Sequence, residues 1–388
     1  MGLKPIKHSF ELKYSYGSYF TDRLFDLKNP TFRDLIQEAK DEGPAKLLFV
    51  IDSGVLKAHT YLNEDIPDYC RFHKYSLELT GIIELPGGEE VKNDPRYLDQ
   101  LLKAIDINKI CRHSYVVAIG GGALIDLAGY AASIAHRGVR HIRIPTTVLS
   151  QNDAAVGVKN GMNLLGKKNF VGSFQIPHAV IIDYHFLTTL DDRDWIAGIA
   201  EAVKVALIKD PDFYQYISDH VADLKKRDKE SMQYLIYRCA ELHMEHIARG
   251  GDPFEKGSSR PLDFGHWSAH KLEHMTNYQI RHGEAVAKGM ALDLVYASEI
   301  GLISAALTDK IIGLLIDIGF DLEIPVKTKT QISDLLSGIE EFREHLGGRL
   351  TITFISSIGE KEDVHEIDLQ RMEASIMVLN DRIKAKMT

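Results

Sequence analysis

The chain has 388 residues, of which 45% are hydrophobic and 26% are charged. Its 46 basic and 55 acidic side chains give a net charge of −9. This composition is typical of a folded soluble protein and excludes an intrinsically disordered chain. Because there is no basic block, it also argues against a nucleic acid or an anionic membrane as partner. The length predicts two domains.

The cysteines and histidines indicate which disulfides, metal sites and cellular compartment to expect. The three cysteines, Cys70, Cys111 and Cys239, are scattered, which predicts neither a disulfide framework nor a thiolate metal site and fits a reducing compartment. No apolar run reaches the ~18 residues of a membrane span, and the N-terminus lacks a signal-peptide core, so we expect a cytoplasmic protein. The chain contains 17 histidines. Either they are scattered over the surface, or some of them are ligands and proton carriers.

Short apolar runs alternate with helical periodicity in the first half of the chain. The runs predict buried strands at Lys46–Asp52, Tyr115–Gly120, His141–Thr147 and Ala179–Asp183. Between them, the apolar spacing predicts amphipathic helices over Pro95–Ile105 and Leu124–His136. Strands that alternate with helices imply βαβ units and a mainly parallel sheet.

Long helical patterns dominate the second half. They predict helices over Asp192–Ile208, Pro211–Lys226, Lys229–Ala248, His282–Ile300 and Ala305–Ile318, and one strand over Leu350–Ser356. Asp210 followed by Pro211 is a typical helix start, with an N-cap and a proline at the first helical position. The change of composition near Thr188 predicts an α/β nucleotide-binding domain over residues 1–188 and a mostly helical domain over 189–388. We expect the active site between them.

A glycine triplet, Gly120–Gly122, follows a predicted strand and opens a helix. Glycines there let backbone N–H groups approach a pyrophosphate, and the helix N-terminus favours the negative charge. The triplet is not the full dinucleotide fingerprint, and a tight strand-to-helix turn explains it equally well. Asp126 lies one turn into the helix. Glu89 and Lys92 are candidates for the rest of a nucleotide site, although alone they resemble a solvated charged loop.

The segment from Pro145 to Gly172 concentrates charge among glycines and small residues. It contains Asp153, Lys159, Lys167, Lys168 and Asn169. Lysines near backbone turns suit a phosphorylated substrate, because each provides a compact positive charge with several donors. A solvated basic hairpin is the alternative, and the local excess of positive charge in an acidic chain favours anion binding.

Glu201 and Lys204 lie three residues apart on a strongly apolar helical pattern, which predicts that both are buried on one face. An exposed ion pair is the ordinary alternative. A carboxylate with two histidines is a common catalytic zinc set. Glu201, His266 and His282 form such a set if their helices converge. The stripe His266, His270, His274 competes, but a straight helix separates its ends by about 12 Å.

Taken together, the motifs resemble the sugar-phosphate cyclase superfamily, whose best-known members are 3-dehydroquinate synthases. The resemblance covers about residues 46–290 and is carried by GGGALIDLAGYAASIAHRG, IPTT, the lysine hairpin, AGIAEAVKVALIKD, FGH and HGEAVAKGM in this order. It implies a Rossmann-like NAD-binding domain followed by a helical metal-binding domain. It also implies bound NAD, one divalent metal (Zn²⁺ or another such as Co²⁺) and a homodimer.

The resemblance assigns roles residue by residue. The NAD-contacting positions correspond to Asp52, Glu89, Lys92, Gly121, Gly122, Asp126, Thr146, Thr147, Lys168 and Thr189. The metal ligands correspond to Glu201, His266 and His282. The positions that bind substrate phosphate or handle protons correspond to Asp153, Lys159, Asn169, Lys204 and His270. Arg137 corresponds to an arginine that reaches the neighbouring subunit's site.

The reaction implied by the resemblance is a closed redox cycle. A ring alcohol is oxidised by NAD, which makes the adjacent proton acidic, and phosphate is then eliminated. The ketone is reduced again, the ring opens, and an intramolecular aldol step forms a carbocycle. NAD is therefore regenerated in each turnover, and the metal acts as a Lewis acid on the alcohol and ketone oxygens.

Several positions depart from the dehydroquinate synthase pattern where that family holds a substrate carboxylate. A helical lysine corresponds to His243, a C-terminal lysine pair corresponds to Arg343 and Glu344, and the threonine after the hairpin lysine is Asn160. The arginine before the FGH motif is displaced by one position to Arg260, and the asparagine of that motif is Asp263. An aspartate there repels a carboxylate in a poorly solvated site.

We therefore expect a substrate with a phosphate and no carboxylate. Within the superfamily this indicates the cyclisation of sedoheptulose 7-phosphate to a valiolone-type carbocycle, and RPLDFGHWSAHKLEH is most similar to the 2-epi-valiolone synthase group. Three alternatives stay open. They are a 3-dehydroquinate synthase with an unusual carboxylate pocket, a metal-dependent polyol or glycerol-phosphate dehydrogenase that releases NADH, and a non-catalytic relative that acts as a binding protein.

Overall fold

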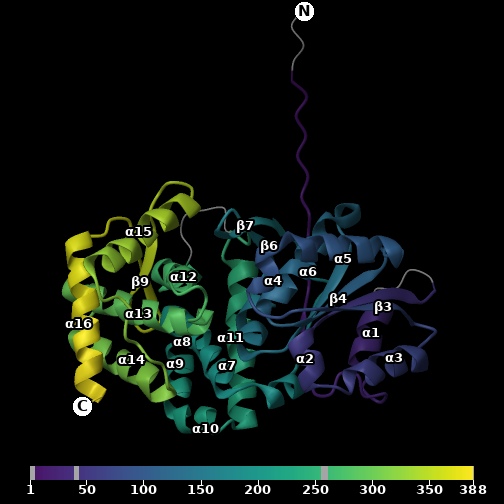
Figure 1. Cartoon of the computed structure of the whole chain (residues 1–388), viewed down its shortest axis with the longest axis horizontal. Coiled ribbons are helices and arrows are strands. Elements are labelled where there is room, and N and C mark those ends of the chain that lie inside the picture. The colour runs from purple at the N-terminus through teal and green to yellow at the C-terminus, as the bar shows by residue number, and fades with distance from the viewer. Residues whose placement is uncertain (1–4, 39–42, 255–260, 388) are drawn as a thin grey trace, which may run out of the picture.

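The computed structural model describes residues 5–38, 43–254 and 261–387. The N-terminal half is built around a β-sheet with helices on both faces, and the C-terminal half is mostly helical (Figure 1). This confirms the expected fold class of a Rossmann-like domain followed by a helical domain. The predicted Arg260 departure lies outside the described residues. No helix in the described ranges is long and apolar enough to cross a membrane.

The central sheet has six parallel strands in the order β1-β8-β5-β4-β2-β3. The strands are β1 (Ser18–Thr21), β2 (Ala45–Asp52), β3 (Leu77–Leu85), β4 (Tyr115–Gly120), β5 (Arg140–Pro145) and β8 (Ala179–Asp183). The four predicted strands are confirmed, whereas β1 and β3 were not predicted. Because all six strands run parallel, their carboxyl ends meet at one edge of the sheet.

Alternate side chains of the strands pack into two apolar layers, one on each face of the sheet. In β2, Leu48 and Val50 pack with helices α5 (Pro95–Ile107) and α6 (Gly122–Ile134). Leu47, Phe49 and Ile51 instead face the opposite layer, which includes residues of α1 (Thr31–Glu38) and α3 (Leu62–Phe72). This two-residue alternation buries both faces of the sheet, which explains why its strands read as nearly continuous apolar runs.

Three shorter elements lie near the sheet. Helices α2 (Ser53–Ala58) and α4 (Glu90–Asn93) follow β2 and β3. A π-helical turn over Ser150–Ala154 leads into an antiparallel hairpin of β6 (Lys159–Leu164) and β7 (Lys167–Phe174). The charge-rich segment of the sequence is therefore a hairpin at the end of the α/β half.

The helical half contains ten α-helices and a two-stranded antiparallel sheet among its described residues. The helices are α7 (Asp192–Ala197), α8 (Ile199–Lys209), α9 (Pro211–Asp219), α10 (Val221–Lys225), α11 (Lys229–Arg249), α12 (His266–Met275), α13 (His282–Glu299), α14 (Ala305–Ile318), α15 (Lys329–His345) and α16 (Leu369–Met387). The strands are β9 (Ile352–Ser357) and β10 (Glu360–Val364). Asp210 caps α9 through the Phe213 amide, which confirms that predicted helix start.

Two helix predictions in this half were too long. The stretch predicted from Asp192 to Ile208 divides at Gly198, which packs so tightly against Val148 and Leu149 that no side chain fits there. The stretch predicted from Pro211 to Lys226 divides at His220, whose backbone leaves the helical region. Periodicity continues across both breaks, so it did not reveal them.

A buried carboxylate in α13 holds the start of α12. Asp293 is fully buried and accepts hydrogen bonds from Trp267 Nε1 at 2.8 Å and from the Gly265 amide at 3.1 Å. Burial raises the pKa of Asp293 from 3.8 to about 7. Asp293 thereby fixes the residues on both sides of His266.

The substitution Asp293→Asn tests this burial through the pH dependence of stability. The folded protein holds a proton on Asp293 that the unfolded chain releases near pH 3.8, so its free energy of unfolding falls as pH rises from about 4 to about 7. The neutral variant lacks this term. We expect wild-type stability to decline relative to the variant by up to about 1.4 kcal/mol per pH unit in this window and to level off above it. Urea unfolding at several pH values measures the difference, and a pH-independent difference would show that Asp293 is ionised throughout.

Candidate active site

The carboxyl edge of the parallel sheet gathers most of the predicted nucleotide-binding residues. Asp52 ends β2, Gly121–Gly122 follow β4, and Thr146–Thr147 follow β5. Thr189 ends the turn after β8, and its hydroxyl lies 2.7 Å from His59 Nε2. These residues are far apart in sequence, and the parallel topology places them at one edge, where open α/β sheets bind ligands.

Two of these positions show how the edge is built. Asp52 caps α2 by accepting a hydrogen bond from the Gly54 amide at 2.7 Å, and burial raises its pKa. Gly121 is the N-cap residue of α6, so the first amides of that helix point out of the edge. The turn after β4 therefore has the geometry expected of a phosphate cradle.

A buried charge cluster borders this edge. The side chain of Lys92 is only 2% exposed, and its Nζ lies 2.8 Å from Asp126, 2.5 Å from Asn169 Oδ1 and 3.7 Å from Glu89. Asn163 donates a hydrogen bond to Glu89 at 2.9 Å. The structure contradicts the alternative of a solvated charged loop at Glu89 and Lys92. Asn169, which we expect in the substrate site, accepts a hydrogen bond from Lys92 in this structure.

Lys168 ties the hairpin to the helical half. Its Nζ lies 2.8 Å and 2.9 Å from the two carboxylate oxygens of Glu273 in α12. Burial alone lowers the pKa of Lys168, but the charges of Glu273 and Glu89 outweigh it and raise the pKa to about 12. Lys168 was predicted to contact the cofactor, and in this structure its ammonium group is held by Glu273.

The three predicted metal ligands converge. Glu201 in α8 is fully buried, and its Oε1 lies 3.6 Å from His266 Nε2 and 3.7 Å from His282 Nε2. The three ligand atoms lie within 4.8 Å of one another. A tetrahedral zinc site separates its ligand atoms by ~3.4 Å. The observed spacing therefore fits one ion with little rearrangement.

Hydrogen bonds orient both histidines toward Glu201. His266 Nδ1 lies 3.1 Å from the Phe264 carbonyl oxygen, and His282 Nδ1 lies 3.0 Å from Glu273 Oε2. Each contact places a proton on Nδ1 and leaves Nε2 as a lone-pair donor. Burial and the nearby Lys204 hold the pKa of His266 well below its usual value, which keeps this ring neutral.

The negative charge of Glu201 is only partly neutralised by its surroundings. Lys204 forms an ion pair with Glu201 Oε2, whereas Oε1 accepts no hydrogen bond from the described residues. Burial raises the pKa of Glu201 even though Lys204 opposes the shift. A buried carboxylate in this state is suited to a bound cation.

Glycines allow the ligand-bearing helices to approach closely. A Cβ on Gly283 would lie 1.9 Å from the Ala197 carbonyl oxygen, so α13 touches the α7–α8 junction through backbone. A Cβ on Gly289 would lie 2.0 Å from the Gly265 carbonyl oxygen, so α13 also touches the start of α12. These contacts bring the first residues of α12 and α13 beside Glu201.

A second triple, His270, Glu273 and His282, also places its potential ligand atoms within 4.8 Å. Glu273 already accepts from His282 and holds Lys168, so it acts as the carboxylate that orients a ligating histidine. His270 stacks 5.8 Å from His282 and lies 5.4 Å from the His266 ring. The Glu201 set is therefore the better metal site, and His270 borders it. The competing stripe that includes His274 is not favoured.

Charged residues around Lys204 form the neighbouring part of the site. His243 Nδ1 in α11 lies 3.0 Å from Asp153 Oδ1. Burial alone raises the pKa of Asp153, but His243 and Lys204 outweigh it and lower the pKa. The charges of Glu201, Asp153 and Asp263 raise the pKa of Lys204 against its burial. Lys204 thus borders the metal set through Glu201, and the negative charges of Asp153 and Asp263 act on it.

The remaining predicted residues lie at the surface or away from the metal set and the nucleotide edge. Lys159 is the exposed first residue of β6. Arg343 is bound to Glu340 on the surface of α15, and Glu344 is exposed beside it. Arg137 lies just before β5, at the amino edge of the sheet, so it is remote from the nucleotide edge of its own chain.

The sequence analysis missed a buried arginine that shapes the Lys159 segment. Arg143 in β5 is fully buried and uses all five of its N–H donors. They reach His141 Nε2, the carbonyl oxygens of Ala155, Gly157 and Lys159, and Asn160 Oδ1. Asn160, noted as a departure from the family, therefore contacts Arg143 rather than the substrate region. An arginine inside an apolar strand run was the available sequence signal.

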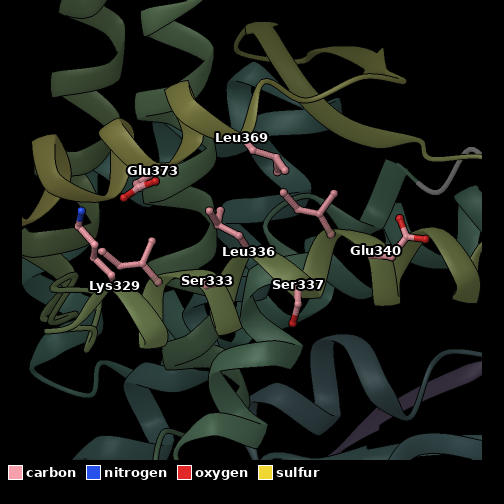
Figure 2. Close-up of a pocket in the computed structure, with 9 residues that line it drawn as sticks. Lys329, Ser333, Leu336, Ser337, Glu340, Leu369 and Glu373 are labelled. Carbon is pink, nitrogen blue, oxygen red and sulfur yellow. The ribbon is translucent and has the colours of Figure 1, made fainter.

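A separate cavity lies outside this site. It has a volume of about 550 Å³ and lies between α15 and the start of α16, lined by residues such as Lys329, Leu336, Glu340 and Glu373 (Figure 2). None of the predicted site residues lines it. We therefore place the chemistry at the junction of the two halves.

The ligand set predicts a specific effect of His266→Ala. Removing one of three ligands should reduce bound zinc to less than a tenth of an equivalent per chain after gel filtration, measured by plasma mass spectrometry. The nucleotide edge is built by the other half, so NAD affinity should change less than threefold. The control is His274→Ala, an exposed histidine on the same helix. Full zinc content in the His266 variant would refute the ligand assignment.

Comparisons with known proteins identify the family of the chain. The 3-dehydroquinate synthase N-terminal model matches residues 82–197, and the 3-dehydroquinate synthase C-terminal model matches residues 198–341. A 3-dehydroquinate synthase of Nitratiruptor sp. is 44% identical over 235 residues, which cover 60% of this chain and 65% of that protein. A 3-dehydroquinate synthase of Shewanella sp. is 34% identical over 300 residues, which cover 77% of this chain and 82% of that protein.

Solved structures give the same result for the fold. ValA, the 2-epi-5-epi-valiolone synthase of Streptomyces hygroscopicus, was solved with NAD⁺ and Zn²⁺ and is 28% identical, with a TM-score of 0.87 over 97% of this chain and 100% of that chain. A 2-deoxy-scyllo-inosose synthase solved with carbaglucose-6-phosphate, NAD⁺ and Co²⁺ is 22% identical, with a TM-score of 0.76 over 92% and 95% of the chains, and shows the shared fold. The sequence matches and the fold agree, and the chain belongs to the dehydroquinate synthase-like family of sugar-phosphate cyclases.

Proposed function

We propose that this chain is an NAD- and divalent-metal-dependent cyclase of a phosphorylated seven-carbon sugar, sedoheptulose 7-phosphate, which it converts to a valiolone-type carbocycle with loss of phosphate. The observation that carries the proposal is the charge around Lys204. Asp153 lies 3.0 Å from His243, and the charges of Asp153 and Asp263 raise the pKa of Lys204. Lys204 offers a single positive charge there, so we assign it to the phosphate, and a second anionic group placed beside Asp153 or Asp263 would be repelled.

Within the described residues, the positions that correspond to the C-terminal lysine pair of dehydroquinate synthases do not provide cations to this site. Arg343 is held by Glu340 on the exposed face of α15, and Glu344 is acidic. By contrast, both lysines that the resemblance assigns to phosphate, Lys159 and Lys204, are present in the sequence. The site therefore favours a phosphate ester without a second anionic group.

Both cofactors fit residues that are present. Glu201, His266 and His282 would hold the metal, and the turn at Gly121–Gly122 with Asp52 would hold the dinucleotide. When bound, NAD supplies a reversible hydride acceptor and the metal polarises the reacting oxygen. The orienting contacts of the two histidines are already made in this structure.

The chain's own residues then provide binding and proton handling. Lys204 is held by Glu201 and directs a positive charge beside the metal set, where it would bind the phosphate or the reacting hydroxyl. Asp153 stays ionised because its pKa is lowered, so it can hold His243 at 3.0 Å and accept a hydrogen bond from a substrate hydroxyl. His270 is kept neutral by burial and Lys168, which suits a hydrogen-bond role next to the substrate.

The expected homodimer gives Arg137 a function. Helix α6 has 13 residues and is roughly 20 Å long, with Gly121 at its start and Arg137 beyond its end. The guanidinium group therefore belongs to the opposite edge of the sheet from its own nucleotide turn. We assign it to the active site of the neighbouring subunit, where it adds positive charge for the phosphate.

A second candidate function is 3-dehydroquinate synthase, because both similar relatives carry that name. The test incubates the zinc-loaded protein and NAD with sedoheptulose 7-phosphate or with the seven-carbon keto acid phosphate, and measures released phosphate. We expect kcat/KM for sedoheptulose 7-phosphate to be at least 100-fold higher.

The assay also separates the other readings. Turnover of the keto acid alone would establish the dehydroquinate synthase instead. Net growth of NADH absorbance in proportion to substrate would indicate a polyol or glycerol-phosphate dehydrogenase. A protein that binds zinc and NAD but releases no phosphate from either compound would be a non-catalytic relative.

A further inference from the structure

An N-terminal arm leaves the body of the molecule. Residues 5–16 belong to no helix or strand and extend away from both halves as the purple trace in Figure 1. Large apolar side chains on this arm are strongly exposed: Ile6 by 86%, Phe10 by 84%, Leu12 by 66% and Tyr14 by 58%. An extended segment with so much exposed apolar surface indicates a missing partner.

The arm has the pattern of a half-buried strand. Its even positions carry Ile6, His8, Phe10, Leu12, Tyr14 and Tyr16, and its odd positions carry Lys7, Ser9, Glu11, Lys13 and Ser15. Because successive side chains of a strand point to opposite faces, this alternation places one apolar and one polar face along the whole arm. Such a face is stable only when the segment is added to a sheet.

The chain offers an open edge at the base of the arm. The arm continues through Gly17 directly into β1, which pairs with β8 on one side and forms the edge of the six-stranded sheet. Aromatic side chains flank this edge. The Phe20 ring lies 5.2 Å from the ring of Tyr237 in α11, which remains 46% exposed, and Tyr19 is 38% exposed.

The arm cannot use the edge of its own β1. No turn occurs between residues 5 and 17, so the arm runs in line with β1 instead of folding back along it. Near the base of the arm, the Tyr16 hydroxyl donates a hydrogen bond to the Val156 carbonyl oxygen at 2.7 Å. This contact fixes the direction in which the arm leaves β1. At ~3.3 Å per residue the arm extends roughly 35 Å, far enough to pass along the four residues of a neighbouring β1.

We propose that the arm of each chain adds as an antiparallel strand to the outer edge of β1 in a second copy of this chain. Under a two-fold axis each chain gives its arm to the partner and receives the partner's arm. The contact is therefore closed and covers the β1 edge of each copy. The apolar face of the arm then covers the exposed aromatic side chains beside the partner's edge. The inference deepens the homodimer of the proposed function and adds the segment that builds its interface.

The test compares two matched double variants by sedimentation velocity. Phe10→Asp/Leu12→Asp places two charges on the apolar face, and Ser9→Asp/Ser15→Asp places the same two charges on the polar face. We expect the first pair to raise the dimer dissociation constant at least 100-fold and the second pair to change it less than threefold. NAD affinity, measured by calorimetry, should be retained in both and reports that the body of the protein is folded.

Hydrogen exchange supplies an independent readout. The alternate amides of the arm that face the partner's β1 should be protected in the wild-type dimer and should exchange freely in the Phe10→Asp/Leu12→Asp variant. A wild-type dimer that neither variant weakens, or whose arm amides are unprotected, would overturn the arm proposal and leave the proposed reaction intact. A monomeric wild-type protein would overturn both the arm proposal and the homodimer.

Discussion

The carboxylate of Glu273 is the contact on which the site depends. It is nearly buried, holds Lys168 of the hairpin through both oxygens, and accepts from His282 Nδ1. Burial alone raises the pKa of Glu273, but the charges of Lys168 and His282 outweigh it and lower the pKa. One side chain thus joins the α/β half to the helical half and turns His282 Nε2 toward Glu201. Its loss would leave a buried ammonium group without its partner.

Carboxylates also hold the other buried lysines at the junction of the two halves. Lys92 is matched with Asp126, and Lys204 with Glu201, so each buried lysine is oriented by a carboxylate before any substrate binds. This preorganisation lets an acidic chain with a net charge of −9 present positive charge at selected points. The proposed choice of substrate rests on the same balance: one phosphate can use the charge of Lys204, and a second anionic group beside Asp153 or Asp263 would be repelled.

Sequence reasoning was strongest where one physical pattern dominates. Strand β4 was predicted with its observed bounds because all six residues are buried and a glycine turn ends the run. The convergence of Glu201, His266 and His282 was also predicted, from their match to a common zinc set and from the family resemblance. The breaks at Gly198 and His220 and the additional strands escaped notice, because they depend on packing against distant segments. Glu273 and Arg143 were missed for the same reason: their partners are identified only by the folded structure.

The family resemblance and the charges of the site bear on different levels of function. The resemblance implies a shared redox cycle, whereas the local environment of Lys204 and the surface position of Arg343 bear on which sugar phosphate enters it. The similarity to relatives named 3-dehydroquinate synthase bears on the redox cycle and not on the choice of sugar phosphate. Substrate choice rests on a few side chains, so overall identity is a poor guide to it.

The most direct test of the central claim is NMR identification of the product formed from ¹³C-labelled sedoheptulose 7-phosphate by the zinc- and NAD-loaded protein. The account predicts a valiolone-type carbocycle, one phosphate released for each ring formed and no net NADH. Recovery of unchanged sugar, or of an oxidised open-chain sugar that accumulates with NADH, would contradict it.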